Sequence, residues 1–183
     1  MHWWKKICLS LAFALAVSAC DVLRHQVPGA LDVRDARIVS AADGAQLEID
    51  LDCQLNGPMS DALEHGIPIT LRIDLRAQTR PLPLSDRREI ELRYFPLSRR
   101  YQLRDLASGN VRSFSAFGSL VDSLGALRLP MPSSFDRLAA GTRVSIEIAL
   151  DHGALPGPLR LPALIEPAWK LAAPEYTWIV AAG

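Results

Sequence analysis

The chain has 183 residues, of which 49% are hydrophobic, and this composition fits a globular protein. Its 20 basic and 20 acidic residues balance, so the charge gives no reason to expect nucleic-acid binding. The sequence has no phosphate-binding glycine loop and no nucleophile turn of a serine hydrolase, and His25, His65 and His152 are too scattered to indicate a metal site. We therefore expect no catalytic residues, no metal and no cofactor.

The N-terminus has the pattern of a bacterial export signal. Lys5 and Lys6 precede an apolar run over residues 7–17, and small residues follow this run. As a helix, residues 7–19 would span roughly 20 Å, well short of the ~30 Å hydrocarbon core of a bilayer. This segment therefore predicts a cleaved signal and not a permanent transmembrane helix.

The residues that end this signal resemble the lipobox of bacterial lipoproteins. In the sequence Val17-Ser18-Ala19-Cys20, the cysteine would be diacylated and would become the first residue of the mature protein. Covalent acyl chains add ~0.8 kcal/mol of membrane binding per buried methylene, so Cys20 would anchor the protein on the periplasmic side of a membrane. Asp21 resembles the residue that retains lipoproteins in the inner membrane of enteric bacteria. Because an ordinary signal peptidase could cut the same bond, a soluble periplasmic protein is the alternative.

These features divide the chain into three parts. We predict a cleaved export signal of the lipoprotein type over residues 1–19, a lipidated tether over 20–30 and a single β-rich domain over 31–183. Removal of residues 1–19 from 183 leaves 164, enough for one domain with a sizeable core. Cys53 is then the sole free thiol, and its place on the apolar side of an alternating run predicts a small buried hydrophobe.

Most of the domain alternates between apolar and polar residues with a period of two, as strands do when one face lies in a core and the other in water. Such runs predict strands over residues 33–40, 47–55, 69–77, 89–94, 111–114 and 144–150, and a further strand that begins at Tyr101. Asp43-Gly44 predicts a tight hairpin turn between the first two strands.

Two segments are predicted to be helical. One or two helical turns are expected over residues 60–65, with Ser60 as the N-cap and Gly66 as the stop. The apolar residues Phe114, Phe117, Leu120, Val121 and Leu124 have helical spacing, which predicts a longer helix over residues 115–127 that packs on a sheet face.

The C-terminal segment is rich in proline. Beyond Asp151 the prolines exclude a long helix, and residues 169–171 and 176–180 are predicted to add short edge strands. Together the elements predict a mainly β domain, an antiparallel β-sandwich or curled sheet with one or two short helical insertions. The lack of alternating strands and helices disfavours a parallel α/β fold.

One strand carries an acidic face. Glu48, Asp50 and Asp52 lie at alternate positions, so their carboxylates could be presented to a cation or to a sugar. The favoured interpretation is a solvated face, because alternating polar residues occur on any half-exposed strand.

The densest basic stretch contains Arg99, Arg100 and Arg104, which form a possible interaction surface for anionic lipid headgroups close to the tether. The favoured alternative is a solvated strand in which Arg104 pairs with Asp105, because the stretch also shows the apolar alternation of a strand.

Aromatic residues gather near the C-terminus. Trp169, Tyr176 and Trp178 lie among prolines, a composition that suits a protein interface with rigid aromatic anchors and makes Trp169 and Trp178 candidate contact residues. Closure of the core by an edge strand is the favoured alternative.

Several stretches also resemble a known family. They are ALEHGIPIT at 62–70, LSRRYQLRDL at 97–106 with RSF at 112–114, and LPGPLR at 155–160 with PAW at 167–169. In this order, after an exported N-terminus and an acidic strand, they resemble the proteobacterial family called domain of unknown function 4390. The similarity covers roughly residues 33–178.

The resemblance implies no catalytic assignment, since no activity is known for the family. The resemblance also implies that genes of this family often lie beside the gene of a membrane sensor kinase of the nitrogen-regulation type. This position implies a partner in the envelope. We therefore expect a non-enzymatic, membrane-tethered periplasmic lipoprotein that binds another envelope protein, such as a sensor kinase. The alternative is a periplasmic ligand-binding domain or hydrolase for a cell-wall or lipid substrate.

Overall fold

The computed structural model describes residues 28–42 and 44–181. The predicted signal over residues 1–19 lies outside the described residues, as do Cys20, Asp21 and His25 of the predicted tether and Asp43 of the predicted hairpin turn.

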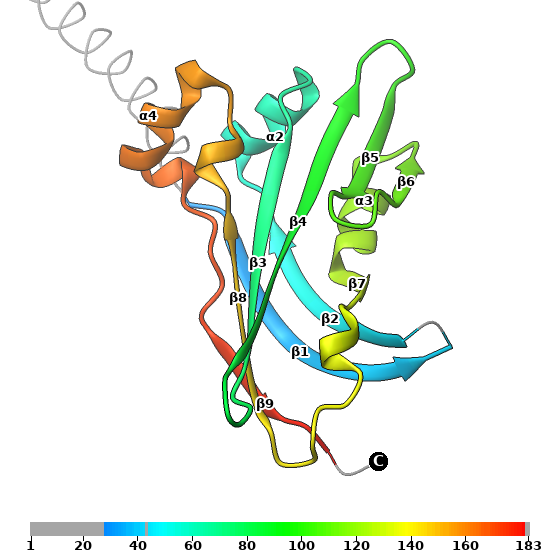
Figure 1. The fold of residues 1–183 in the computed structure, drawn as a ribbon. Coiled ribbons are helices and arrows are strands. Elements are labelled where there is room, and N and C mark those ends of the chain that lie inside the picture. The colour runs from blue at the N-terminus through cyan, green and yellow to red at the C-terminus, as the bar shows by residue number, and fades with distance from the viewer. Residues whose placement is uncertain (1–27, 43, 182–183) are drawn as a thin grey trace, which may run out of the picture.

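The domain is built from two antiparallel sheets, as predicted (Figure 1). Strands make up 47% of the described residues and helices 23%. The small sheet has the order β1-β2-β7, and its strands are β1 (Ala30–Ala41), β2 (Gly44–Gln54) and β7 (Ala126–Pro130). The large sheet has the order β6-β5-β4-β3-β8-β9, and its strands are β3 (Ile69–Ala77), β4 (Leu84–Phe95), β5 (Arg100–Asp105), β6 (Val111–Phe114), β8 (Arg143–Leu150) and β9 (Tyr176–Ile179).

Three short α-helices and three 3₁₀ turns connect the strands of the described residues. They are α2 (Gly57–Glu64), α3 (Phe117–Gly125), α4 (Gly157–Ile165), η1 (Ser133–Phe135), η2 (His152–Ala154) and η3 (Pro167–Trp169). None of these helices is long and apolar enough to cross a membrane.

The strands with the cleanest alternation form the core. In β2 the side chains of Leu47, Ile49, Leu51 and Cys53 are buried, and the polar residues between them face outward. The central strands β3 and β8 likewise bury Ile73 and other aliphatic side chains. A period of two therefore predicted these strands because each has one face against the core.

A β-bulge at Arg34 changes the alternation within β1. Val33 pairs with Leu51 and Asp35 with Asp50, so Arg34 is an extra residue that has no opposite residue in the backbone register with β2. The inward side chains are therefore odd-numbered before the bulge and even-numbered after it, as the buried Ala36 shows. The bulge leaves Arg34 and Asp35 both exposed, so it adds a charged residue to the outer face of the small sheet.

Helix α2 begins earlier than predicted. Its N-cap is Asn56 and not Ser60, and the Asn56 side chain accepts a hydrogen bond from the Met59 N–H at 3.0 Å. Its predicted end is confirmed, because Gly66 adopts a φ of 81° and its N–H donates to the Leu63 carbonyl oxygen at 2.9 Å.

The prediction for residues 115–127 is partly wrong. Helix α3 ends at Gly125, and residues 126–130 form β7, which pairs with β2. Leu127 and Leu129 are buried because β7 turns one face to the core, and the helical spacing hid this alternation.

The C-terminal segment also differs in part from the prediction. Residues 157–165 form the nine-residue helix α4, in which Pro158 occupies the first turn, where a proline is tolerated. The predicted strand at 169–171 is wrong, because Trp169 ends the 3₁₀ turn η3. The predicted edge strand at 176–180 is confirmed as β9.

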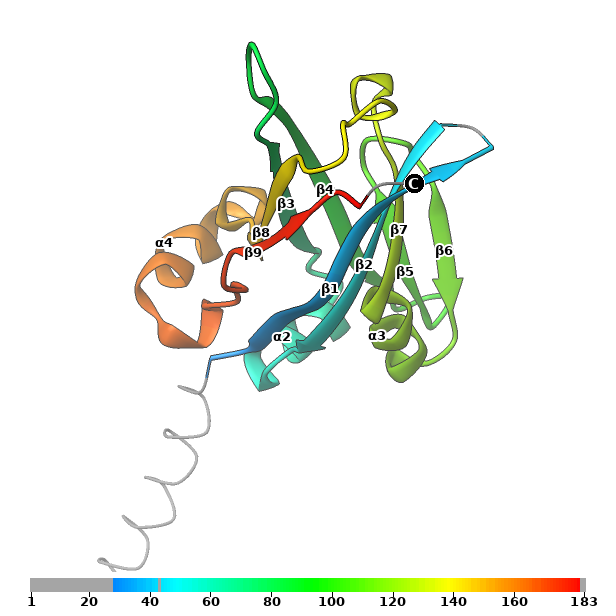
Figure 2. The same ribbon diagram turned by 90° about the horizontal axis from the view of Figure 1, so that it is seen from below.

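The connecting segments mark two ends of the molecule. Figure 1 shows α4, α2 and the β4–β5 turn at one end, and the β3–β4 turn and the C-terminus at the other. The described chain begins at the end that carries α4, as Figure 2 also shows. A Cβ on Gly29 would lie 2.8 Å from Leu171 Cδ1 and 3.6 Å from Met59 Sδ, which places the start of the chain between α2 and the segment after α4.

Candidate functional site

The two sheets approach each other where β1 faces β9. The Tyr176 hydroxyl of β9 donates to Asp35 Oδ1 of β1 at 3.4 Å, although 141 residues separate them in the chain. Towards the C-terminal end of β9 this junction opens into a hollow of about 580 Å³, which we call the seam hollow. Its apolar lining includes Ile38, Val39, Phe135, Leu138, Trp178 and Val180.

Local structure places these side chains. Ile38 turns inward because it follows the bulge of β1, and Trp178 lies on the inner face of β9, opposite the buried Val144. The ring centroids of Tyr176 and Trp178 are 6.1 Å apart, so the two rings pack along β9. The lining acid Asp136 accepts a hydrogen bond from the Ala45 N–H at 2.8 Å.

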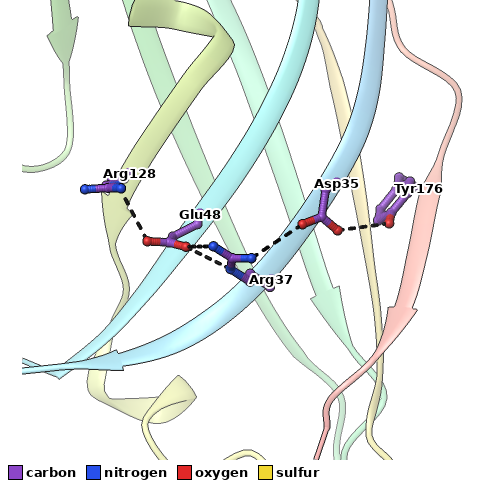
Figure 3. Close-up of polar contacts among 5 residues, drawn as sticks. All are labelled: Asp35, Arg37, Glu48, Arg128 and Tyr176. Carbon is purple, nitrogen blue, oxygen red and sulfur yellow. Dashed lines mark hydrogen bonds and ion pairs between the residues drawn. The ribbon is translucent and has the colours of Figure 1, made fainter.

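A chain of ion pairs runs along the outer face of the small sheet beside this hollow (Figure 3). Arg37 donates from Nε and Nη2 to Glu48 Oε2 at 2.8 and 2.6 Å, and Arg128 Nε lies 3.5 Å from Glu48 Oε1. Arg37 Nη1 also lies 3.9 Å from Asp35 Oδ2. The hydrogen bonds and the charge of Glu48 raise the pKa of Arg37.

The predicted acidic face is therefore largely a face of ion pairs. Asp52 binds Arg34 with 2.5 Å between Oδ2 and Nη2, and Glu48 binds two arginines. Asp50 is exposed and makes no ion pair within residues 28–42 and 44–181. It lines a surface hollow of about 240 Å³ together with Arg37, Glu48 and Arg128.

The three arginines of the basic stretch do not lie together. Arg99 and Arg100 are exposed at the β4–β5 turn, where Arg99 has a φ of 51°, whereas Arg104 lies further along β5 opposite Glu91. The predicted pair of Arg104 with Asp105 is wrong. Asp105 is buried on the other face of β5, where its carboxylate accepts from the Ala107 N–H at 2.9 Å and the Ser108 hydroxyl at 2.6 Å.

The two candidate tryptophans, Trp169 and Trp178, also lie in different parts of the structure. Trp169 is only 6% exposed and lies in the core, as the favoured alternative of core closure expects. Trp169 ends the 3₁₀ turn η3, and this turn packs against α2, which explains why the side chain is buried. Trp178 is half-buried and lines the seam hollow.

Other candidate groups have structural roles. Burial, together with the charge of Asp52, raises the pKa of the Cys53 thiol to about 11, which fits the predicted buried hydrophobe. His65 Nδ1 lies 2.7 Å from the Asp61 carbonyl oxygen, and His152 Nε2 lies 3.2 Å from that of Trp169. The described part of the chain holds no group of three or more His, Cys, Asp or Glu that could bind a metal ion.

Two features of the structure were not predicted from the sequence. The seam hollow joins β1 to β9, and no local pattern signals a junction between such distant segments. The second is an ion pair on the inner face of β4, where Arg88 Nε lies 2.6 Å from Asp86 Oδ2. Extending the alternation of Ile90 back along the strand would have placed both residues inside.

Comparison with known proteins identifies one family. The family model described as "Domain of unknown function (DUF4390)" matches residues 29–179, which cover almost the whole described domain. No match was found among curated proteins or among solved structures.

Proposed function

The chain belongs to the DUF4390 family, and from this premise we propose that it is a membrane-tethered lipoprotein of the bacterial envelope whose β domain binds another envelope protein without catalysing a reaction. The observation that carries the binding proposal is the seam hollow. Its volume of about 580 Å³ is that of a site for large apolar side chains, and Trp178 offers it a rigid aromatic wall.

The charged groups around this hollow favour the binding of a protein partner over catalysis of a reaction. Arg37 is held by Glu48, and the Asp136 carboxylate accepts a backbone N–H. Groups engaged in this way orient a partner's polar rim and contribute specificity, while the apolar lining contributes affinity.

The proposed partner is a membrane sensor kinase, the class that the family resemblance implies. The proposed anchor restricts the partner to proteins near the bilayer. The eight residues from Cys20 to Val27 can extend to roughly 29 Å at most, so acyl chains on Cys20 would hold the domain close to the membrane surface. Asp21 supports retention in the inner membrane, where sensor kinases reside.

The anchor is tested by the intact mass of the protein extracted from membranes. We expect a chain that begins at Cys20 and carries acyl chains, and we expect Cys20→Ala to be unprocessed or released from the membrane. An unlipidated mature chain recovered from the soluble periplasm would contradict the anchor, and the alternative of a soluble periplasmic protein would replace it.

The partner is tested with a photoreactive residue in living cells. We expect the variant with this residue in place of Val39, which lines the seam hollow, to give one discrete adduct with a membrane protein. The same residue in place of Val111, an exposed valine of β6, is the matched control and should give none. Trp178→Ala should remove the Val39 adduct at an unchanged protein level. Equal labelling from both positions, or no protein adduct from Val39, would contradict protein binding at the hollow.

Binding or hydrolysis of a cell-wall or lipid substrate is a second candidate. One observation favours it: Asp50 lines a hollow of about 240 Å³ with Arg37 and Arg128, an arrangement of opposite charges that suits a polar ligand. The cross-linking experiment separates the two candidates, because a polar ligand leaves no protein adduct at Val39.

A further inference from the structure

Helix α4 is apolar on two opposite faces. Ala163 is buried, and Leu159 and Pro162 are half-buried on the side that packs on the domain. The opposite side exposes three large aliphatic residues, Leu161 at 71%, Leu164 at 64% and Ile165 at 79%. A surface helix of a soluble domain normally has a polar outer face, so this outer face is suited to contact with an apolar medium.

The three exposed residues form one stripe. Their spacing of three and four residues places them on the same face of the helix. The only charged residue of α4 is Arg160, whose Nε donates to the Leu155 carbonyl oxygen at 2.8 Å. Its guanidinium is therefore turned back along the helix.

A second apolar group is exposed at the same end of the molecule. Leu97, in the β4–β5 turn, is fully exposed at 105%, and the exposed arginines Arg99 and Arg100 follow it. Figure 1 shows this turn and α4 at the same end. An apolar side chain beside two cations matches the surface of an anionic bilayer, where acyl chains lie beneath phosphate groups.

The N-terminal chain enters the domain at this end too. Gly29 lies against Met59 and Leu171, next to α2 and the segment that follows α4 (Figures 1 and 2). The eight residues from Cys20 to Val27 reach roughly 29 Å at most, so an anchor on Cys20 keeps this end towards the membrane.

The charges at this end are mixed. Helix α2 lies between α4 and the turn in Figure 1, and its residues Asp61 and Glu64 are exposed. The exposed Glu166 follows the apolar stripe. Docking therefore depends on insertion of the aliphatic side chains, and the two arginines of the turn add the attraction to anionic lipid.

We propose that the stripe of Leu161, Leu164 and Ile165 on α4 and the β4–β5 turn with Leu97 dock together on the surface of an anionic bilayer. The aliphatic side chains then lie at the boundary between headgroups and acyl chains, and Arg99 and Arg100 lie at the phosphates. This inference rests on the proposed anchor at Cys20. It orients β9 and the seam hollow away from the bilayer, where they are accessible to the periplasmic part of a partner (Figure 1).

The test uses the full-length processed protein in lipid vesicles, with an environment-sensitive fluorophore on one cysteine. Leu164→Cys and Leu97→Cys place the reporter at the two proposed contacts. Leu82→Cys is the matched control, because Leu82 is a leucine with 74% exposure in the β3–β4 turn at the opposite end. Cys53 stays unlabelled because it is buried and its pKa is raised to about 11.

Vesicles of phosphatidylethanolamine with phosphatidylglycerol are compared with vesicles of phosphatidylcholine. We expect the reporters at Leu164 and Leu97 to shift to shorter wavelength and to gain intensity several-fold on the anionic vesicles, and the reporter at Leu82 to stay unchanged. Arg99→Gln with Arg100→Gln should reduce the shift of the Leu164 reporter on anionic vesicles and leave flotation of the anchored protein intact.

The outcomes separate the anchor from the docking face. Protein that floats with vesicles while either reporter stays unchanged would overturn the docking face and leave the anchor standing. Protein that carries no lipid and does not float would instead contradict the proposed anchor. A shift at Leu164 that appears in native membranes but not in pure lipid would overturn lipid docking and assign the stripe to a protein partner.

Discussion

Replacing Arg88 by methionine is expected to lower the free energy of unfolding by about 3 kcal/mol, because it leaves the Asp86 carboxylate on the inner face of β4 without its cation. The side chains of Arg88 and Asp86 are only 11% and 17% exposed. Their cross-strand neighbours in β3 are Ile73 and Leu75, which are buried. The value lies at the low end of the range for buried pairs because water still reaches part of Asp86.

The double variant tests the cause of this loss. Arg88→Met with Asp86→Leu removes both charges and fills the space with apolar atoms, so we expect it to recover most of the stability lost in Arg88→Met. Urea denaturation of the wild type, both single variants and the double variant completes the cycle. A double variant as unstable as Arg88→Met would show that packing of the arginine side chain, and not charge pairing, accounts for the loss.

An exposed pair provides the matched control. Arg76 Nη1 lies 3.7 Å from Glu147 Oε1 on the outer face of the same sheet, and both side chains are at least half exposed. Arg76→Met should therefore change the free energy of unfolding by less than about 1 kcal/mol. An equal loss in Arg76→Met and Arg88→Met would contradict the importance of burial.

The elements that could be predicted from the sequence are those whose pattern reflects contact with the core. β2, β3 and β8 each bury one face, so the alternation of apolar and polar residues along each strand follows the alternation of buried and exposed side chains. β7 was missed because its burial depends on pairing with β2, a strand about eighty residues earlier, while the helical spacing of α3 runs into its first residues.

The same distinction applies to the candidate site. The outward carboxylates Glu48 and Asp52 could be predicted from β2 alone, but their pairing with Arg37 and Arg34 depends on the register with β1 and on its bulge. The seam hollow forms because β9, near the end of the chain, lies against β1, near its described start. Local sequence therefore predicts which side chains face outward, whereas only the tertiary structure brings them together.

Trp169→Ala is expected to lower the free energy of unfolding by about 3 to 5 kcal/mol, the cost of removing a large buried aromatic side chain. Trp169 ends η3, which packs on α2, and the preceding Ala168 carbonyl oxygen accepts a hydrogen bond from Asn56 Nδ2 at 2.5 Å. Removal of the Trp169 side chain should therefore weaken the packing between α2 and the C-terminal segment. Urea denaturation measures it.

Trp178→Ala is the matched comparison, because the sequence alone did not distinguish these two tryptophans. Trp178 is half-buried at the wall of the seam hollow, so we expect it to cost about 1 to 2 kcal/mol, since only part of its surface is removed from water. Its larger effect should be on partner binding, measured as loss of the adduct from Val39, whereas Trp169→Phe should keep that adduct. If Trp178→Ala were the more destabilising of the two alanine variants, Trp178 would be a core residue and the hollow would lose its aromatic wall as a binding element.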